Sequence, residues 1–212
     1  MLQLHDTATG SRAALHGAAD GRVGLYVCGP TVYAPPHIGH GRFTLVYDIL
    51  RRYLESTGVA VDHVSNVTDI DDKIIARAET EGRTEPAVAA EFEADWWEAM
   101  AGLGVLEPTT ITHATSYVDD MIGLVSDLVS RGVAYETSDG VYLEVALVPG
   151  YGLLAQQSLE SLRAGARVEV NEEKRAPFDF AVWKKAKPGE PQWEAPFGAG
   201  RPGWHTECVV MA

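Results

Sequence analysis

The sequence has little cysteine, no excess of positive charge and no long apolar run. Two cysteines, Cys28 and Cys208, in 212 residues are too few for a disulfide-stabilised fold and favour a reducing, cytoplasmic setting. No apolar run reaches about 18 residues, and no signal-peptide pattern is present. We therefore predict neither a membrane span nor secretion.

The charge balance is acidic. Lysine and arginine number 17 against 30 aspartates and glutamates, a formal net charge of -13. Proteins that bind nucleic acid by general phosphate neutralisation are basic, so any such contact would have to be local or made elsewhere. Hydrophobic residues make up 46% of the chain, enough for the core of one large domain or of a domain that carries an insertion.

The first third of the chain predicts a strand–helix–strand unit. Residues 24–33 are β-branched and aromatic and contain Gly-Pro, which is typical of a buried strand followed by a turn. Residues 43–58 place apolar side chains at helical spacing on one face, and residues 59–68 alternate like a strand. Such a unit begins α/β folds, in which helices cover a parallel sheet.

The remainder predicts further helices, a hairpin and an insertion. We expect helices over 69–82, 85–104 and 116–132, then a hairpin over 133–145 with Asp-Gly at its turn. An inserted region should run from about 113 to 178, with the main sheet resumed from 179. The chain stops directly after the apolar segment CVVMA, as if the next helix were cut off.

The segment YAPPHIGHGRF, residues 33–43, places two histidines at the mouth of a helix. The prolines prevent a helix before His37, and residues three apart, such as His37 and His40, share one side of a helix. Gly39 allows a flat ring or a phosphate to approach the backbone. Two imidazoles beside the N–H groups of a helix N-terminus could donate to phosphate oxygens during phosphoryl or nucleotidyl transfer. A metal pair or ordinary loop histidines remain alternatives.

The two cysteines could be small buried apolar residues or metal ligands. If Cys28 and Cys208 faced one cleft, their thiolates would make half of a zinc site, although their spacing matches no local zinc motif. His205 and Glu207 are possible ligands, but they are too close to Cys208 in sequence to be assigned without geometry.

Polar residues follow the strand expected over 59–68. Thr68 would direct its hydroxyl into the crevice at the end of that strand, where open parallel sheets bind ligands. The acids Asp69, Asp71 and Asp72 could line that crevice or merely cap the next helix.

Two tryptophan positions invite different interpretations. We expect the adjacent pair Trp96 and Trp97 to be core residues. Trp204, which follows Arg-Pro-Gly close to Cys208, could form the floor of a small pocket.

Four separated blocks resemble cysteinyl-tRNA synthetase, a class I aminoacyl-tRNA synthetase: LYVCGPTVYAPPHIGHGR, VSNVTDIDDKIIARA, FDFAVWKKAKPGEPQW and GRPGWHTECVVMA. The resemblance implies a Rossmann-type catalytic domain over 1–112, a connective insertion over 113–178 and an incomplete return to the catalytic domain over 179–212. It also implies a ligase that forms cysteinyl-adenylate from ATP, with Mg²⁺, and passes cysteine to tRNA(Cys).

The resemblance also assigns site residues. His37 and His40 would be catalytic, and ATP would be bound by Gly29, Pro30, Thr31, His37, Gly39 and His40. Thr68 and Trp204 would contact the substrate cysteine. Cys28 and Cys208 would be two of four ligands to one Zn²⁺, which binds the substrate thiolate and so rejects serine and valine by bond type.

Several family features are missing from these 212 residues. The His and Glu that complete the zinc site, the Lys-Met-Ser-Lys-Ser loop and the anticodon-binding domain would follow the last block. We therefore expect a monomeric, N-terminal piece that has little adenylate-forming activity, and we expect tRNA to be bound mainly by the absent domains. A cysteine:amino-sugar ligase of the same superfamily and a non-catalytic nucleotide-binding remnant remain alternatives.

Overall fold

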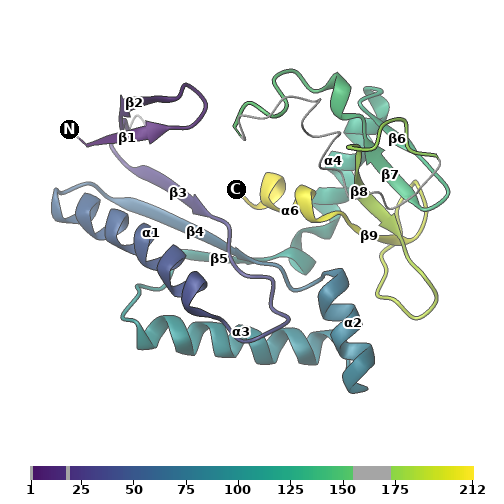
Figure 1. Cartoon of the computed structure of the whole chain (residues 1–212), viewed down its shortest axis with the longest axis horizontal. Helices are drawn as coiled ribbons and strands as arrows, with labels where there is room; N and C mark the ends of the chain where they lie inside the picture. The colour runs from purple at the N-terminus through teal and green to yellow at the C-terminus, as the bar shows by residue number, and fades with distance from the viewer. Residues whose placement is uncertain (1, 18–19, 155–172) are drawn as a thin grey trace. The chain divides into compact units, whose positions relative to one another are not determined.

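The computed structural model describes residues 2–17, 20–154 and 173–212, and the chain divides into two compact units (Figure 1). The first, here called the parallel-sheet unit, comprises His16–Tyr117 and Glu207–Ala212. The second, the antiparallel-sheet unit, comprises Met1–Leu15 and Val118–Thr206. In the described part of the chain, no helix is both long and apolar enough to cross a membrane.

The parallel-sheet unit confirms the predicted α/β class. Its sheet has the order β3-β4-β5, and both pairings are parallel. Parallel neighbours require a crossover connection, which is helical on both occasions here. The elements in chain order are β3 (Val23–Val27), α1 (Ile38–Ser56), β4 (Val61–Val67), α2 (Asp72–Glu81), α3 (Glu85–Gly102), β5 (Thr110–His113) and the 3₁₀ turn η1 (Ala114–Tyr117). The short strand β5 was not predicted.

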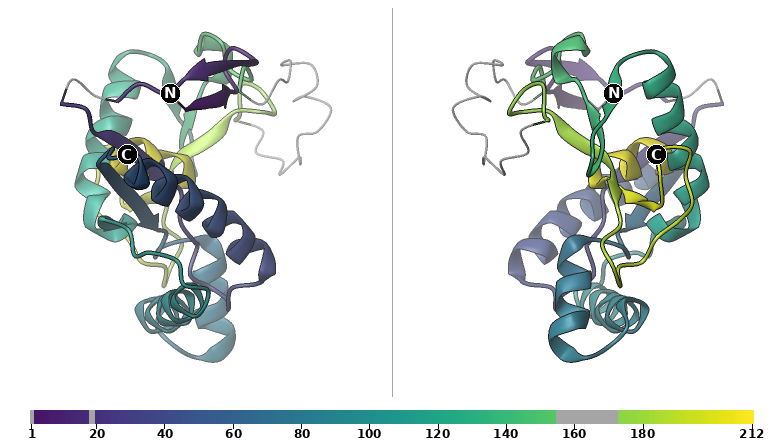
Figure 2. Two further views of the ribbon diagram at one scale, coloured as in Figure 1. Left: turned by 90° about the vertical axis from the view of Figure 1, so that its left-hand side faces the viewer. Right: turned by 90° about the vertical axis from the view of Figure 1, so that its right-hand side faces the viewer.

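The two faces of β4 have different neighbours. His63 and Ser65 face a space that is also lined by residues of α1 and α3, and Figures 1 and 2 show both helices on this side of the sheet. α3 is seen nearly end on in Figure 2. Because side chains alternate along a strand, Asn66 projects from the opposite face of β4. That face carries the buried hydrogen bonds that join Asn66, Thr68 and Glu207, described below.

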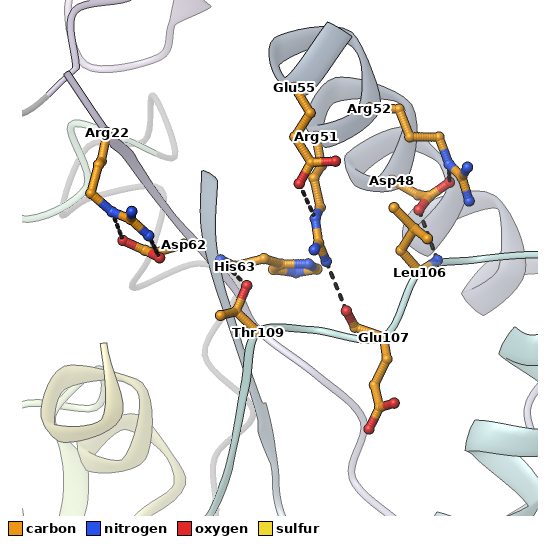
Figure 3. A network of polar contacts seen from close by, with 10 residues as sticks. All are labelled: Arg22, Asp48, Arg51, Arg52, Glu55, Asp62, His63, Leu106, Glu107 and Thr109. Carbon is orange, nitrogen blue, oxygen red and sulfur yellow. Dashed lines mark hydrogen bonds and ion pairs between the residues drawn. The ribbon is translucent and has the colours of Figure 1, made fainter. Parts of the chain in front are cut away.

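Helix α1 is fastened to the loop before β5 by polar contacts, not by the apolar stripe that the sequence predicts (Figure 3). Val46 is 58% exposed and Ile49 64% exposed, so the prediction that this stripe packs is wrong for these residues. Instead, the buried Asp48 carboxylate accepts from the Leu106 N–H at 2.9 Å and from Arg52 Nε at 2.7 Å. Other bonds from α1 reach two carbonyls of the loop, Arg51 to Glu107 and Arg52 to Gly104.

His63 lies beside this network. It is 5% exposed, and neither ring nitrogen has a hydrogen-bond partner among the residues that the structure describes. Burial and the neighbouring Arg51 guanidinium lower the pKa of His63, whereas Asp48 acts in the opposite direction. The ring is therefore held in its neutral form.

Among its described residues, the antiparallel-sheet unit contains a four-stranded sheet, helix α4 and a separate hairpin. The sheet order is β6-β7-β8-β9 with every neighbour antiparallel. The hairpin predicted over 133–145 is confirmed as the β6–β7 pair. The elements are β1 (Gln3–Asp6), β2 (Ser11–Ala14), α4 (Val118–Ser130), β6 (Ala134–Glu136), β7 (Gly140–Leu143), η2 (Val145–Leu147), β8 (Phe180–Lys185) and β9 (Gly200–Pro202).

Strands β8 and β9 do not extend the parallel sheet. Both continue the sheet of the predicted insertion, so the prediction that the main sheet resumes at residue 179 is wrong for these strands. Trp183 on β8 is fully buried in the core of the antiparallel-sheet unit, which explains this pairing. The final helix α6 (Trp204–Met211) begins in this unit and ends in the parallel-sheet unit. Part of the predicted irregular region, 155–172, lies outside the described residues.

Candidate functional site

The loop after β3 lies against the end of β4 and extends the parallel pairing. The Thr68 N–H donates to the Pro30 carbonyl at 2.9 Å, and Thr31 forms a bridge with Thr68. A Cβ on Gly29 would lie 1.8 Å from the Asn66 carbonyl oxygen, so only glycine fits this approach. The Gly29 N–H donates to Asn66 Oδ1 at 2.9 Å. The sheet therefore fixes the positions of residues 29–31.

The two histidines cap helix α1. His37 is the N-cap, and its Nδ1 accepts from the Gly39 N–H at 3.1 Å, while His40 Nδ1 accepts from the His37 N–H at 3.2 Å. The rings are stacked with centroids 3.8 Å apart. A Cβ on Gly39 would lie 2.9 Å from the His37 ring. The space left by the missing side chain of Gly39 is therefore occupied by His37.

This capping arrangement fixes the protons of both rings. A ring nitrogen that accepts a hydrogen bond carries no proton, so each neutral imidazole must carry its proton on Nε2. Burial and the nearby His37 lower the pKa of His40, which favours the neutral form of His40. At neutral pH the helix mouth thus presents hydrogen-bond donors that suit anionic oxygens.

A cavity of about 250 Å³ brings together the residues that were assigned to ATP, except Gly39, which is not in its lining. Its lining includes Gly29, Pro30, Thr31, Tyr33, His37, His40, Phe43, Lys73 and Trp96. Trp96 is 5% exposed and so is a core residue, as predicted, but it also contacts the His40 ring edge to face. Lys73 lies over the Tyr33 ring at 4.8 Å and adds a cation to the cavity lining. The sequence places Lys73 in the polar cluster at the end of the strand, where ligands are expected, but assigns it no specific role.

The sulfurs of Cys28 and Cys208 lie 3.5 Å apart although the residues are 180 positions apart in sequence. Hydrogen bonding between them stabilises a singly ionised pair, lowering the pKa of Cys208 to about 6 and raising that of Cys28. Two thiolates held about 2.3 Å from one tetrahedral zinc lie about 3.8 Å apart, so this pair fits half of a zinc site. Within the described residues, no group of three His, Cys, Asp or Glu side chains could hold a metal ion.

Next to the sulfurs lies a chain of buried hydrogen bonds. The Thr68 hydroxyl donates to Glu207 Oε2 at 2.5 Å, and Asn66 Nδ2 donates to Thr68 Oγ1 at 3.5 Å. Asn66 Oδ1 accepts from the Tyr26 hydroxyl at 3.0 Å as well as from Gly29. Burial raises the pKa of Glu207 to about 8. The nearby Cys208, Asp71 and Asp69 also raise this pKa. Asn66 and Glu207 were not predicted to have these roles.

The remaining predicted residues are placed as follows. Asp71 caps α2 by accepting from the Lys73 N–H at 2.9 Å, and Asp69 accepts from the Thr115 N–H and hydroxyl. Capping therefore explains Asp71.

Trp204 belongs to the antiparallel-sheet unit, where it is 51% exposed and lies beside His205. Its meeting with Thr68 in one pocket remains a prediction.

The chain is similar to known proteins over its whole length. Proteins called "Cysteine--tRNA ligase" are 46% identical in Syntrophotalea carbinolica, over 211 residues, and 47% identical in Pyrococcus furiosus, over 212 residues. Each match includes 100% of this chain and 44% of the relative, so the chain spans less than half of their length. A relative of the same name from Thermotoga maritima is 46% identical, and 46% of its length is matched.

A solved structure supports the fold alone. It is the ternary complex of Agrobacterium radiobacter K84 agnB2 LeuRS with tRNA and LeuAMS, with a TM-score of 0.50 and 22% identity over 58% of this chain and 16% of that one. Residues 15–212 match the family described as the class I (C) tRNA synthetase catalytic domain. The chain therefore belongs to this family.

Proposed function

We propose that this chain binds ATP and cysteine and forms cysteinyl-adenylate as part of a cysteine–tRNA ligase, which then transfers cysteine to tRNA(Cys). One observation carries the proposal. The loop after β3 contributes Gly29, Pro30 and Thr31 to the cavity at the helix mouth and Cys28 to the thiol pair. The ATP site and the site that recognises sulfur would thus be formed in part by consecutive residues of one loop.

In this reaction the carboxylate of cysteine attacks the α-phosphorus of ATP, and pyrophosphate leaves. No protein nucleophile is needed, so the chain contributes positioning and charge stabilisation. His37 and His40 would donate from Nε2 to phosphate oxygens, and Gly29, Pro30 and Thr31 would line the ATP site. Gly39 would leave room for the His37 ring at the helix mouth, and Mg²⁺ would accompany ATP.

Cys28 and Cys208 would hold a zinc ion together with two ligands from beyond these residues. When bound, zinc supplies a position that prefers a thiolate over a hydroxyl, which is a physical basis for choosing cysteine over serine. Thr68 and Trp204 would complete the amino-acid pocket. A connective insertion whose sheet also contains β8 and β9, a monomeric state, a cytoplasmic location and a tRNA interface mainly outside this chain belong to the same proposal.

The test is cysteine-dependent exchange of pyrophosphate into ATP. It should use the 212-residue chain and a hybrid in which this chain replaces the matching part of the Pyrococcus furiosus relative. We expect little exchange from the chain alone. We expect the hybrid to respond to cysteine and not to serine, and His40→Ala to lower its kcat/KM by roughly a hundredfold.

A matched control is Lys187→Met, a charge removal in the antiparallel-sheet unit, which should leave exchange unchanged. A hybrid that binds ATP but exchanges with no amino acid would identify a non-catalytic remnant. Exchange followed by transfer to an amino sugar and not to tRNA would identify the other ligase.

A further inference from the structure

The two cysteines come from distant parts of the chain, and no covalent link sets their separation. Cys28 follows β3 and is exposed, while Cys208 is half-buried on α6. Groups that are buried more deeply than the sulfurs are therefore candidates for setting the distance of 3.5 Å between them.

Those groups form one continuous chain of hydrogen bonds. It begins at the backbone N–H of Gly29, directly after Cys28, and passes through the Asn66 side chain and the Thr68 hydroxyl. It ends at the carboxyl of Glu207, directly before Cys208. Both ends thus lie one residue from a sulfur-bearing residue.

Burial gives this chain its stiffness. Asn66 is 0% exposed, and Thr68 and Glu207 are each 1% exposed, so water cannot replace a lost partner without opening the structure. A typical hydrogen bond adds about 0.5–1.5 kcal/mol, but an orphaned buried partner costs about 1–3 kcal/mol. Movement of α6 away from β3 would break these bonds as the sulfurs part.

We propose that Asn66 and Glu207 are positioning residues that act through Thr68 to hold the thiols of Cys28 and Cys208 at the separation which one bridging atom requires. Neither residue is assigned a contact with substrate. The inference deepens the proposed function and rests on it for the identity of the metal, although the positioning itself concerns only the two sulfurs.

The experiment uses two probes on the 212-residue chain, kept reduced throughout. Phenylarsine oxide bridges two nearby thiols: two As–S bonds replace the As=O bond, and the thiol protons leave with the oxygen as water. Co²⁺ replaces zinc and reports thiolate ligation through sulfur-to-cobalt charge-transfer absorption. The variants are Asn66→Leu and Glu207→Leu, with the conservative Asn66→Asp and Glu207→Gln, which keep acceptor oxygens.

A matched control is Tyr135→Phe, which removes a buried hydroxyl donor in the antiparallel-sheet unit, at 2.8 Å from Asp179. We expect both leucine variants to bind phenylarsine oxide roughly tenfold more weakly than the parent, the size of one lost buried hydrogen bond. The conservative variants should recover most of the affinity, and the control should match the parent.

Leucine variants that bind the arsenical as tightly as Tyr135→Phe would overturn the positioning role. If a leucine variant does not fold, Thr68→Val decides, because it keeps the side-chain volume but removes the hydroxyl that joins Asn66 to Glu207, and it should bind the arsenical several-fold more weakly; parent-like affinity would overturn the role. Arsenical binding that follows this pattern without cobalt–thiolate absorption in the parent would overturn the zinc site and leave the positioning role supported.

Discussion

Asp179 and Glu207 are each 1% exposed, one in each unit of the molecule, and they have different hydrogen-bond partners. Asp179, in the antiparallel-sheet unit, accepts from the Tyr135 hydroxyl and from the backbone N–H groups of Val145 and Ala176. Glu207, in the parallel-sheet unit, accepts from Thr68 alone among the described residues, and its pKa is raised to about 8. With its three donors, Asp179 connects separate backbone segments of the antiparallel-sheet unit. Glu207 has a single donor and lies next to the thiol pair of the candidate site.

The largest effect should come from removing the better-satisfied carboxylate. Asp179→Ala removes the acceptor of three donors, of which the Tyr135 hydroxyl and the Val145 N–H are buried, so we expect the free energy of unfolding to fall by about 3 kcal/mol or more. Glu207→Gln keeps an acceptor for Thr68 and should change it by less than about 1 kcal/mol. Urea unfolding followed by circular dichroism measures both. Equal losses would remove the distinction between the two carboxylates.

A smaller effect concerns the cation that lines the nucleotide cavity. Lys73→Met should weaken ATP binding roughly tenfold, because a charge that can meet phosphate oxygens is lost while most of the side-chain volume is kept. Isothermal titration calorimetry provides the measurement. The same change at the exposed Lys187 of the antiparallel-sheet unit is the control, and equal weakening by both variants would show a non-specific charge effect.

The smallest effect is a change in pH dependence. The folded state lowers the pKa of His63 below its unfolded value of about 6.5, so the unfolded chain binds a proton that the folded chain rejects. Stability should therefore fall as the pH drops below about 6.5. His63→Phe should make this decline shallower. The lowered pKa values of His40 and His205 act in the same direction and persist in the variant. An unchanged slope would contradict the account of His63.

The parts of the structure that are local in sequence were predictable, and those that depend on distant pairing were not. The strand, the helix mouth and the histidine pair lie within about 20 residues, where periodicity and proline restrictions act directly. Strand β5 is short and polar, with Thr110 exposed, so it carries no periodic signal. The sheet that β8 joins depends on burying Trp183 among residues far along the chain.

The residues of the candidate site also divide into those that the local sequence predicts and those that depend on distant pairing. Gly39 and the histidines follow from one tetrapeptide, whereas the approach of Cys28 to Cys208 is implied only by resemblance to a family. Asn66 has no sequence signal, because a polar residue inside a strand usually faces solvent. Its function becomes visible only when Gly29, Tyr26 and Thr68 are seen around it.

The central claim is that the parallel-sheet unit brings Cys28 and Cys208 together as metal ligands. The direct measurement is the zinc affinity of the metal-replete chain, determined against a competing chelator, for the parent, Cys28→Ser, Cys208→Ser and the control Tyr135→Phe. The account predicts one zinc per parent chain and per control chain, and at least roughly tenfold weaker binding in each serine variant, since soft thiolates dominate such sites. Equal affinity in all four proteins would contradict it.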